Sequence, residues 1–533
     1  MSKEEVVPTL FVREATGITR ELGTGSAIAI GLSIAYGSGI NWYSTWSSYN
    51  YPGANVAIGY LLPILTLMPT TLITLGFAIC LPRSGGYYVW YSRFFHGGYA
   101  VMSQWTSIIT PGMSSALLCW FVSSFLSLTI ALYGNYTHNP GLMDFATYLK
   151  SNIPFRLAVT IGLILLMGLG NIFGMRVLKW LVNITVAYGL LGTFIQYILF
   201  AITPSSAVPA KWDAVWGAGA YKEVVDITNA NGFQEWRAAA GTGINWNNTM
   251  RVLVPAEWGY SGYMTAVSSF AGETRNPSRN IPIATVGTLI LVGSIYALLC
   301  ALMYGTYGDF VARLCYAHAK GLVDQFTIMS DVDPVTPTFS CSLTTNPIIQ
   351  FIVSSATFIW LFNTALPGPS SSARYLFAVA FDRFAPEWFA EVNERFHSPM
   401  NAVIYYTLGT ILFTFFAAYN VFIMIATTAI TVGISSTVQA LAAVELSLFK
   451  TDIYERGYVY SIGGIPWLAI VAVFALFRGL YKMGIAGMDI DMFSCYFIGT
   501  TWAIGLFIYI LYCIYNKRRG IDVKKLFEEM PPE

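Results

Sequence analysis

The chain has 533 residues, a mean hydropathy of +0.57, 11% charged residues and a formal net charge of +1. Soluble domains carry about 25% charged residues, so this composition excludes an ordinary soluble protein, and the near-neutral charge gives no reason to expect a nucleic-acid partner. Repeated apolar runs of about 18 residues or more instead predict an all-α polytopic membrane protein, with the lipid bilayer as its surroundings.

Twelve transmembrane helices are predicted, as two sets of five and a C-terminal pair. In chain order, the segments are a cytoplasmic N-terminal segment (1–21), a first five-helix repeat (22–201), an extracellular loop (202–248), a second five-helix repeat (249–446) that includes an extracellular loop (306–346), helices 11 and 12 (447–515) and a cytoplasmic tail (516–533).

The positions of Lys and Arg predict the orientation. If the N-terminus is inside, most of the 29 basic residues fall on the cytoplasmic face, among them Arg83, Arg275 and Arg374. Because short cytoplasmic loops are enriched in Lys and Arg, both termini are predicted to be cytoplasmic. The polar N-terminus does not resemble a cleavable signal peptide, and we expect a multi-pass protein of the plasma membrane.

The first predicted membrane helix contains Ala35-Tyr36-Gly37-Ser38-Gly39-Ile40. Glycine costs about 1 kcal/mol relative to alanine in a helix interior. In lipid, a broken helix persists only where it lines a cavity or is buried in protein, so such a break indicates a binding site near the bilayer midplane. The alternative is that the small residues let two helices pack closely.

The sixth predicted helix contains a second glycine-interrupted stretch, Glu257-Trp258-Gly259-Tyr260-Ser261-Gly262. Helices 1 and 6 are five spans apart and enter the membrane from opposite sides. Two broken helices at matching places in oppositely oriented halves are typical of an inverted-repeat transporter. The pair therefore favours the binding-site interpretation over simple packing.

Backbone dipoles at the two breaks suit the head group of an α-amino acid. Amide N–H groups near Ser38–Ile40 would face a carboxylate, and carbonyl groups near Ile34–Tyr36 and Ala256–Gly259 would face an ammonium group. The predicted substrate-binding residues come from both helices. They are Ala35, Tyr36, Gly37, Ser38, Gly39, Ile40, Trp258, Gly259, Tyr260, Ser261 and Gly262.

Several motifs resemble those of the amino acid–polyamine–organocation permeases. They are the helix 1 stretch 33–40, Pro82-Arg83-Ser84-Gly85-Gly86-Tyr87 after helix 2, Phe270-Ala271-Gly272-Glu273-Thr274-Arg275-Asn276-Pro277 at the end of helix 6, and Ser372-Ala373-Arg374-Tyr375 after helix 8. The resemblance implies a leucine-transporter-type fold, with a five-plus-five inverted repeat, broken helices 1 and 6 and two extra helices. It also implies amino acid uptake or exchange by alternating access, coupled to protons, sodium or a counter-substrate.

The resemblance also implies roles for single residues. Ser38 and Gly39 would hold the substrate carboxylate, and carbonyl groups near Ala35 and Trp258 would hold the amine. An aromatic side chain of helix 6, Trp258 or Tyr260, would act as a gate. The chain departs from the family at 186–190 of helix 5, where proton-coupled members can carry a lysine and this sequence has none.

Three further residues are candidates for a proton or cation site. Glu257 is an acidic residue inside a broken membrane helix, and such residues are functional candidates by default. The alternative is a solvated carboxylate at the outer mouth. Ser371 and Ser372 follow Pro367-Gly368-Pro369 and could contribute hydroxyls to a sodium site against helix 1, or could instead bond carbonyls at a kinked helix end.

The function predicted from the sequence is a secondary amino acid transporter. A polyamine or cationic amino acid transporter or exchanger, and an amino acid sensor on a transporter scaffold, are the alternatives. An enzyme is not expected, because the membrane segments do not cluster His, Asp and Glu, and no cofactor or metal is expected beyond coupling to H⁺ or Na⁺. The substrate side chain, the oligomeric state and a disulfide between Cys315 and Cys341 stay open.

Overall fold

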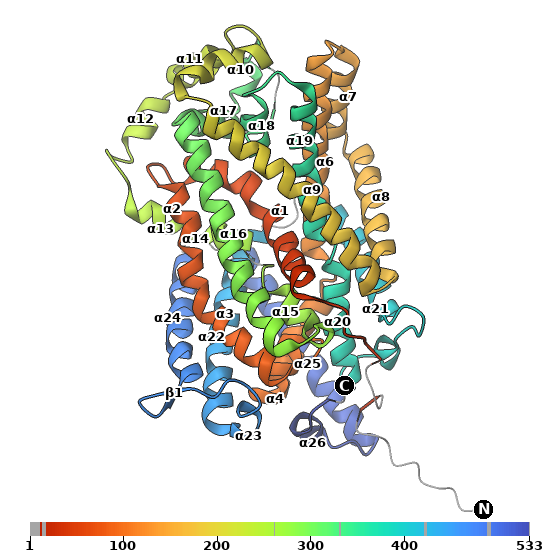
Figure 1. The fold of residues 1–533 in the computed structure, drawn as a ribbon. Helices are drawn as coiled ribbons and strands as arrows, with labels where there is room; N and C mark the ends of the chain where they lie inside the picture. The colour runs from red at the N-terminus through yellow and green to blue at the C-terminus, as the bar shows by residue number, and fades with distance from the viewer. Residues whose placement is uncertain are drawn as a thin grey trace, which may run out of the picture.

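The computed structural model describes residues 11–12, 17–260, 262–329, 332–419, 424–487 and 492–531. The side chains of Ser38, 424–430, 485–487 and 493–494 are not described, and Ser261 lies outside the described residues. The described part of the chain is helical apart from short connections and one two-stranded hairpin (Figure 1). This confirms the predicted all-α class.

Residues 17–202 form nine helices. They are α1 (Thr24–Asn50), α2 (Val56–Leu61), α3 (Pro63–Cys80), α4 (Gly86–Phe94), α5 (Gly97–Ile109), α6 (Met113–Tyr136), α7 (Pro140–Ser151), α8 (Ile153–Ile172) and α9 (Met175–Ile202). Predicted helix 2 is formed by α2 and α3, and predicted helix 3 by α5 and α6.

The second half is divided into more pieces. The long helices are α16 (Pro277–Tyr307), α19 (Pro347–Ala365), α20 (Gly368–Phe381), α21 (Met400–Ala418), α22 (Met424–Phe449), α24 (Trp467–Gly487) and α25 (Met492–Arg518). The short elements before, between and after them are α14 (Leu253–Tyr260), α15 (Thr265–Phe270), η2 (Ala271–Glu273), η4 (Glu387–Ala390), α23 (Thr451–Tyr454), β1 (Ser461–Ile462), β2 (Ile465–Pro466) and α26 (Val523–Glu528).

Within the described residues, ten helical segments are long and apolar enough to cross a membrane. They correspond to predicted spans 2–5 and 7–12, which confirms a polytopic membrane protein. Neither α1 nor the pieces of predicted helix 6 is among the ten, because α1 is rich in Ser, Gly and Tyr and α14 and α15 are short. The total of twelve spans stays a prediction.

The predicted break in helix 1 is wrong for this structure, since α1 is one helix of 27 residues. The glycines serve close packing instead. A Cβ atom on Gly37 would lie 2.1 Å from Oγ1 of Thr364 and 2.2 Å from the carbonyl oxygen of Trp360, and one on Gly39 would lie 2.8 Å from Cα of Gly259. Because a side chain at either position would collide with α19 or α14, the small-residue packing alternative explains this stretch.

The predicted break in helix 6 is confirmed. The outer half, α14, ends at Tyr260, and the inner half, α15, begins at Thr265 after a turn. Gly262 in this turn lies against α1, where an added Cβ would come within 1.8 Å of the side chain of Ile34. Predicted helix 8 is also divided, between α19 and α20, next to Pro367.

The two predicted extracellular loops are largely helical rather than extended. They contain η1 (Ser205–Ala207), α10 (Val208–Trp216), α11 (Ala220–Ala230), α12 (Phe233–Ala238), α13 (Trp246–Arg251), α17 (Phe310–Ala319), η3 (Val323–Gln325) and α18 (Thr336–Cys341). Of these elements, α10, α11, α17 and α18 lie together at one end of the bundle, opposite α4, α23 and α26 (Figure 1). Tyr221 and Phe310 join the loops with stacked rings 4.1 Å apart, so the loops form one cap.

The two cysteines of the second loop do not form a disulfide. Cys315 and Cys341 are both buried and free. The cap is therefore held by apolar and hydrogen-bonded contacts rather than by a covalent cross-link between these residues.

Candidate functional site

The hydroxyl of Tyr296, on α16, bridges α1 and α14. It donates to the carbonyl oxygen of Ala35 and lies 3.2 Å from the carbonyl oxygen of Gly259. Gly259 is in the last turn of α14, where carbonyl groups lack a partner within the helix. The two carbonyl groups predicted to face a substrate amine thus converge on one point, which a buried hydroxyl group occupies.

Tyr36 packs against Tyr296, with ring centroids 5.6 Å apart, and it also contacts α9 and α19. Its ring packs against Trp360 with centroids 4.4 Å apart, and the hydroxyl of Thr193 donates to its hydroxyl oxygen at 3.0 Å. Tyr36 is 1% exposed. This side chain therefore supports the wall of the site, and its phenol group is already hydrogen-bonded.

The two aromatic residues predicted as gates differ in position. Tyr260 is fully buried and donates to the carbonyl oxygen of Tyr60 at 2.6 Å, so it joins α14 to α2. Trp258 is half-buried and packs edge-on against Tyr43 of α1, with ring centroids 5.3 Å apart. Of the two, Trp258 lies along the face between α1 and α14 and is the better placed to cover a ligand there.

The remaining helix 1 candidates lie on the buried length of α1. Gly37 faces α19, Gly39 faces α14, and Ile40 is 0% exposed. Because α1 is continuous through these residues, the amide groups near Ser38–Ile40 belong to the helix interior and not to a helix start. The predicted carboxylate site at a helix N-terminus is therefore not formed in this structure.

Asn363 of α19 is a buried polar residue that the sequence did not single out. It is 0% exposed, and neither its Nδ2 nor its Oδ1 has a hydrogen-bond partner among the described residues. The next residue, Thr364, donates to the carbonyl oxygen of Ser33 in α1 at 2.9 Å. A buried carboxamide without partners costs free energy, so Asn363 is a candidate for polar contact with a ligand.

Ser371 lies against the inner half of helix 6. Its Oγ is 2.6 Å from Oγ of Ser269 in α15, and it is buried, whereas Ser372 is half-buried. The hydroxyl of Ser371 therefore joins α20 to α15 rather than to α1. A sodium-binding role for these two serines stays a prediction.

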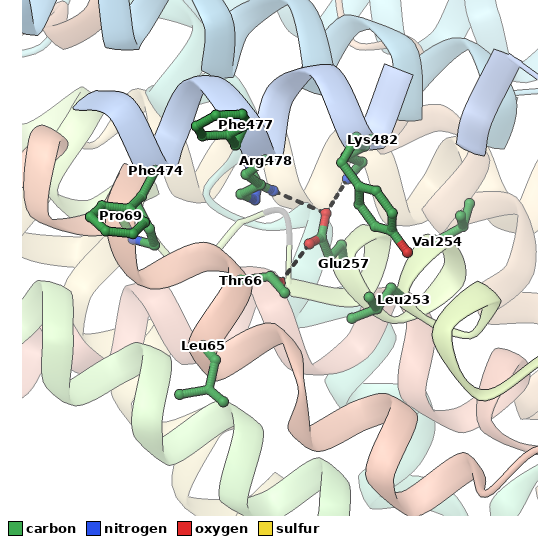
Figure 2. A pocket seen from close by; sticks show the side chains of 11 residues that line it. Leu65, Thr66, Pro69, Leu253, Val254, Glu257, Phe474, Phe477, Arg478 and Lys482 are labelled. Carbon is green, nitrogen blue, oxygen red and sulfur yellow. Dashed lines mark hydrogen bonds and ion pairs between the residues drawn. The ribbon is translucent and has the colours of Figure 1, made fainter. Parts of the chain in front are cut away.

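Glu257 is buried among cations, which excludes the alternative of a solvated carboxylate. Its Oε2 lies 2.9 Å from Nη2 of Arg478 and 2.6 Å from Nζ of Lys482, and its Oε1 accepts a hydrogen bond from Thr66 at 2.8 Å (Figure 2). The three charged side chains are 6–8% exposed. The charge of Glu257 is thus already balanced, which leaves little attraction for a cationic ligand.

An ion pair and two backbone hydrogen bonds tie the inner half of helix 6 to neighbouring elements. Arg374 of α20 binds Glu273 with two hydrogen bonds of 2.6 and 3.1 Å, and both side chains are at most 1% exposed. The backbone of Leu22, just before α1, bonds to Glu273 and Arg275 at 2.9 and 2.8 Å. These contacts hold this end of helix 6 against α20 and the residue before α1.

Two features of this region were missed from the sequence. Tyr296 is one tyrosine in an apolar helix, and nothing in its neighbourhood along the chain distinguishes it. Arg478 and Lys482 did give a signal, because two cations four residues apart inside an apolar span require a nearby counter-charge.

A family described as "Amino acid permease" matches residues 22–504. Cationic amino acid transporter 1 of Arabidopsis thaliana is 28% identical over 164 residues, which cover 30% of this chain and 24% of that protein. Polyamine transporter PUT1 of Oryza sativa subsp. japonica is 24% identical over 256 residues, which cover 47% of this chain and 38% of that protein. The alignments thus span well under half of these relatives.

Proposed function

Because this chain belongs to the amino acid permease family, we propose that it is a secondary transporter that moves amino acids across the plasma membrane by alternating access. The head group of the substrate binds between α1 and the interruption of helix 6. The observation that supports this most directly is the convergence of the Ala35 and Gly259 carbonyl groups on the hydroxyl of Tyr296.

A hydroxyl group has one proton and can satisfy only one of these two acceptors at a time, whereas an ammonium group has three donors. An α-amino group that displaces the Tyr296 hydroxyl would therefore bond both carbonyl groups. The carboxylate needs donors that the closed α1 does not offer, so we propose that α1 opens at Gly37–Gly39 when substrate binds. Asn363 is a further donor candidate for the substrate.

We propose that the substrate carries an uncharged side chain. The side chains nearest the bridge are aromatic, and Tyr60 and Tyr260 both pack against Tyr296 with centroids 5.9 and 5.1 Å apart. The acidic residue of α14, Glu257, is paired with two cations. The printed names of the relatives favour a second candidate function, transport of a cationic amino acid or a polyamine.

Uptake into proteoliposomes tests both candidates. Radiolabelled leucine, phenylalanine, arginine and spermidine are each offered with a proton gradient, with a sodium gradient and with internal counter-substrate. Saturable uptake of leucine or phenylalanine supports the first proposal, and uptake of arginine or spermidine alone supports the second. Binding of an amino acid without any flux would identify a sensor and contradict both.

A further inference from the structure

A pocket of about 330 Å³ lies on the side of the helix bundle, between α3, α14 and α24. Figure 2 shows its side chains projecting from these three helices around Glu257. Much of its wall is apolar and exposed on the outer surface of the bundle, where the bilayer would surround it. Leu65, Phe474 and Phe477 are 71%, 61% and 67% exposed.

The floor of this pocket carries an excess positive charge. Arg478 and Lys482 of α24 share a single carboxylate, that of Glu257, and in the described part of the chain neither cation contacts a second carboxylate. A one-to-one pair of Glu257 with Lys482 would already be balanced. Arg478 therefore adds one positive charge, 7% exposed, at a depth where an uncompensated charge is costly.

The Arg478 guanidinium also has an unused donor. Its Nη2 donates to Glu257 and its Nη1 donates to Oγ of Ser436 at 2.6 Å, but its Nε is buried without a partner among the described residues. A buried guanidinium with an unsatisfied N–H group and an excess charge is suited to an oxyanion, which accepts hydrogen bonds from several donors at once.

We propose that this pocket binds a membrane lipid with an anionic head group. The charge excess of Arg478 and Lys482 selects the negative head group, and the exposed apolar wall of Leu65, Phe474 and Phe477 takes its acyl chain. A free inorganic anion would match the charge but would leave that wall unused. Neither the substrate site between α1 and α14 nor its proposed function is needed for this inference.

Photolabelling tests the proposal on the full chain in nanodiscs. The probe is phosphatidylglycerol with a diazirine on its acyl chain, present at a low fraction in phosphatidylcholine, and labelled peptides are identified by mass spectrometry. We expect adducts on residues of α3 and α24 that line the pocket. Unlabelled phosphatidylglycerol should suppress them, whereas added phosphatidylcholine or inorganic phosphate should not.

Arg478→Gln keeps the balanced pair of Glu257 and Lys482, so the fold should be retained. Because the variant removes charge-assisted hydrogen bonds to the head group, labelling should fall about tenfold or more. Arg518→Gln removes an exposed charge on α25 and is the matched control, with unchanged labelling. Glu257→Gln raises the positive charge of the pocket and should keep or increase labelling.

Equal labelling by a phosphatidylcholine probe would overturn the proposal. So would competition by inorganic phosphate, or unchanged labelling in a folded Arg478→Gln variant. The competition experiments with unlabelled lipids and inorganic phosphate use the wild-type chain alone. They therefore test the proposal even if a variant fails to fold.

Discussion

The hydroxyl of Tyr296 gives the sharpest test of the proposed head-group site. Tyr296→Phe removes the donor that bridges Ala35 and Gly259 and keeps the ring. A neutral hydrogen bond contributes about 0.5–1.5 kcal/mol net, so the free energy of unfolding should fall by about 1 kcal/mol. If the substrate ammonium group displaces this hydroxyl, the substrate no longer has to compete for the carbonyl groups. Its Kd should then decrease roughly fivefold.

Equilibrium binding of the transported amino acid to the detergent-purified protein, together with thermal unfolding, measures both effects. Tyr60→Phe is the matched control. Tyr60 is also fully buried and packs against Tyr296, but its hydroxyl has no hydrogen-bond partner among the described residues. Its variant should leave Kd unchanged. The displacement argument would be refuted if Tyr296→Phe bound the amino acid no more tightly than the wild type while Tyr60→Phe kept the wild-type affinity.

Three other predictions concern packing, ion pairs and pH. Gly39→Ala should lower both the thermal stability and uptake, since its Cβ would lie 2.8 Å from the backbone of α14; normal unfolding with lost uptake would instead favour a direct substrate role. Arg374→Met should cost about 3–5 kcal/mol of stability by leaving Glu273 buried and unpaired, and adding Glu273→Gln should restore most of it in thermal unfolding. Burial raises the pKa of Glu223 but hydrogen bonds from 327–329 lower it more, to below the ordinary 4.5. The ionised Glu223 therefore stabilises the cap fully above pH 4.5, and this stabilisation is lost as the pH falls through the lowered pKa. Hydrogen exchange of amides 327–329 should become faster over that pH range in the wild type and should not change in Glu223→Gln.

Much of the architecture could be predicted from the sequence, because membrane spans are long apolar runs and the bilayer fixes their length. The break in helix 6 was also predictable. Gly259 and Gly262 interrupt that helix, and the structure ends α14 at Tyr260. The unbroken course of helix 1 was not predictable, although its residue pattern is similar. A glycine pair serves equally well to break a helix or to let two backbones approach, and only the position of the neighbours decides between these uses.

The contacts of the candidate site depend on residues far apart in the chain. Tyr296 is 261 residues from Ala35, and Arg478 is 221 residues from Glu257. No local pattern encodes such pairings, because they arise only when the helices assemble. A buried charge nevertheless limits the alternatives. Glu257 in a membrane helix needed a cationic partner, and Arg478 and Lys482 of predicted helix 11 were two candidates inside a span.

The two proposed sites share α14, and this leads to a final prediction. Glu257 on one face holds α14 to α24, and two residues later the carbonyl of Gly259 belongs to the head-group site. A lipid that binds Arg478 weakens its hold on Glu257 and so changes the position of α14. Because linkage is reciprocal, the anionic lipid should alter the substrate Kd, with couplings of about 1–3 kcal/mol being typical. Substrate affinity should therefore differ between phosphatidylcholine nanodiscs with and without phosphatidylglycerol, and Arg478→Gln should remove the difference. A lipid effect of equal size in wild type and Arg478→Gln would show that it arises elsewhere, and the absence of any effect in wild type would show that α14 does not couple the sites.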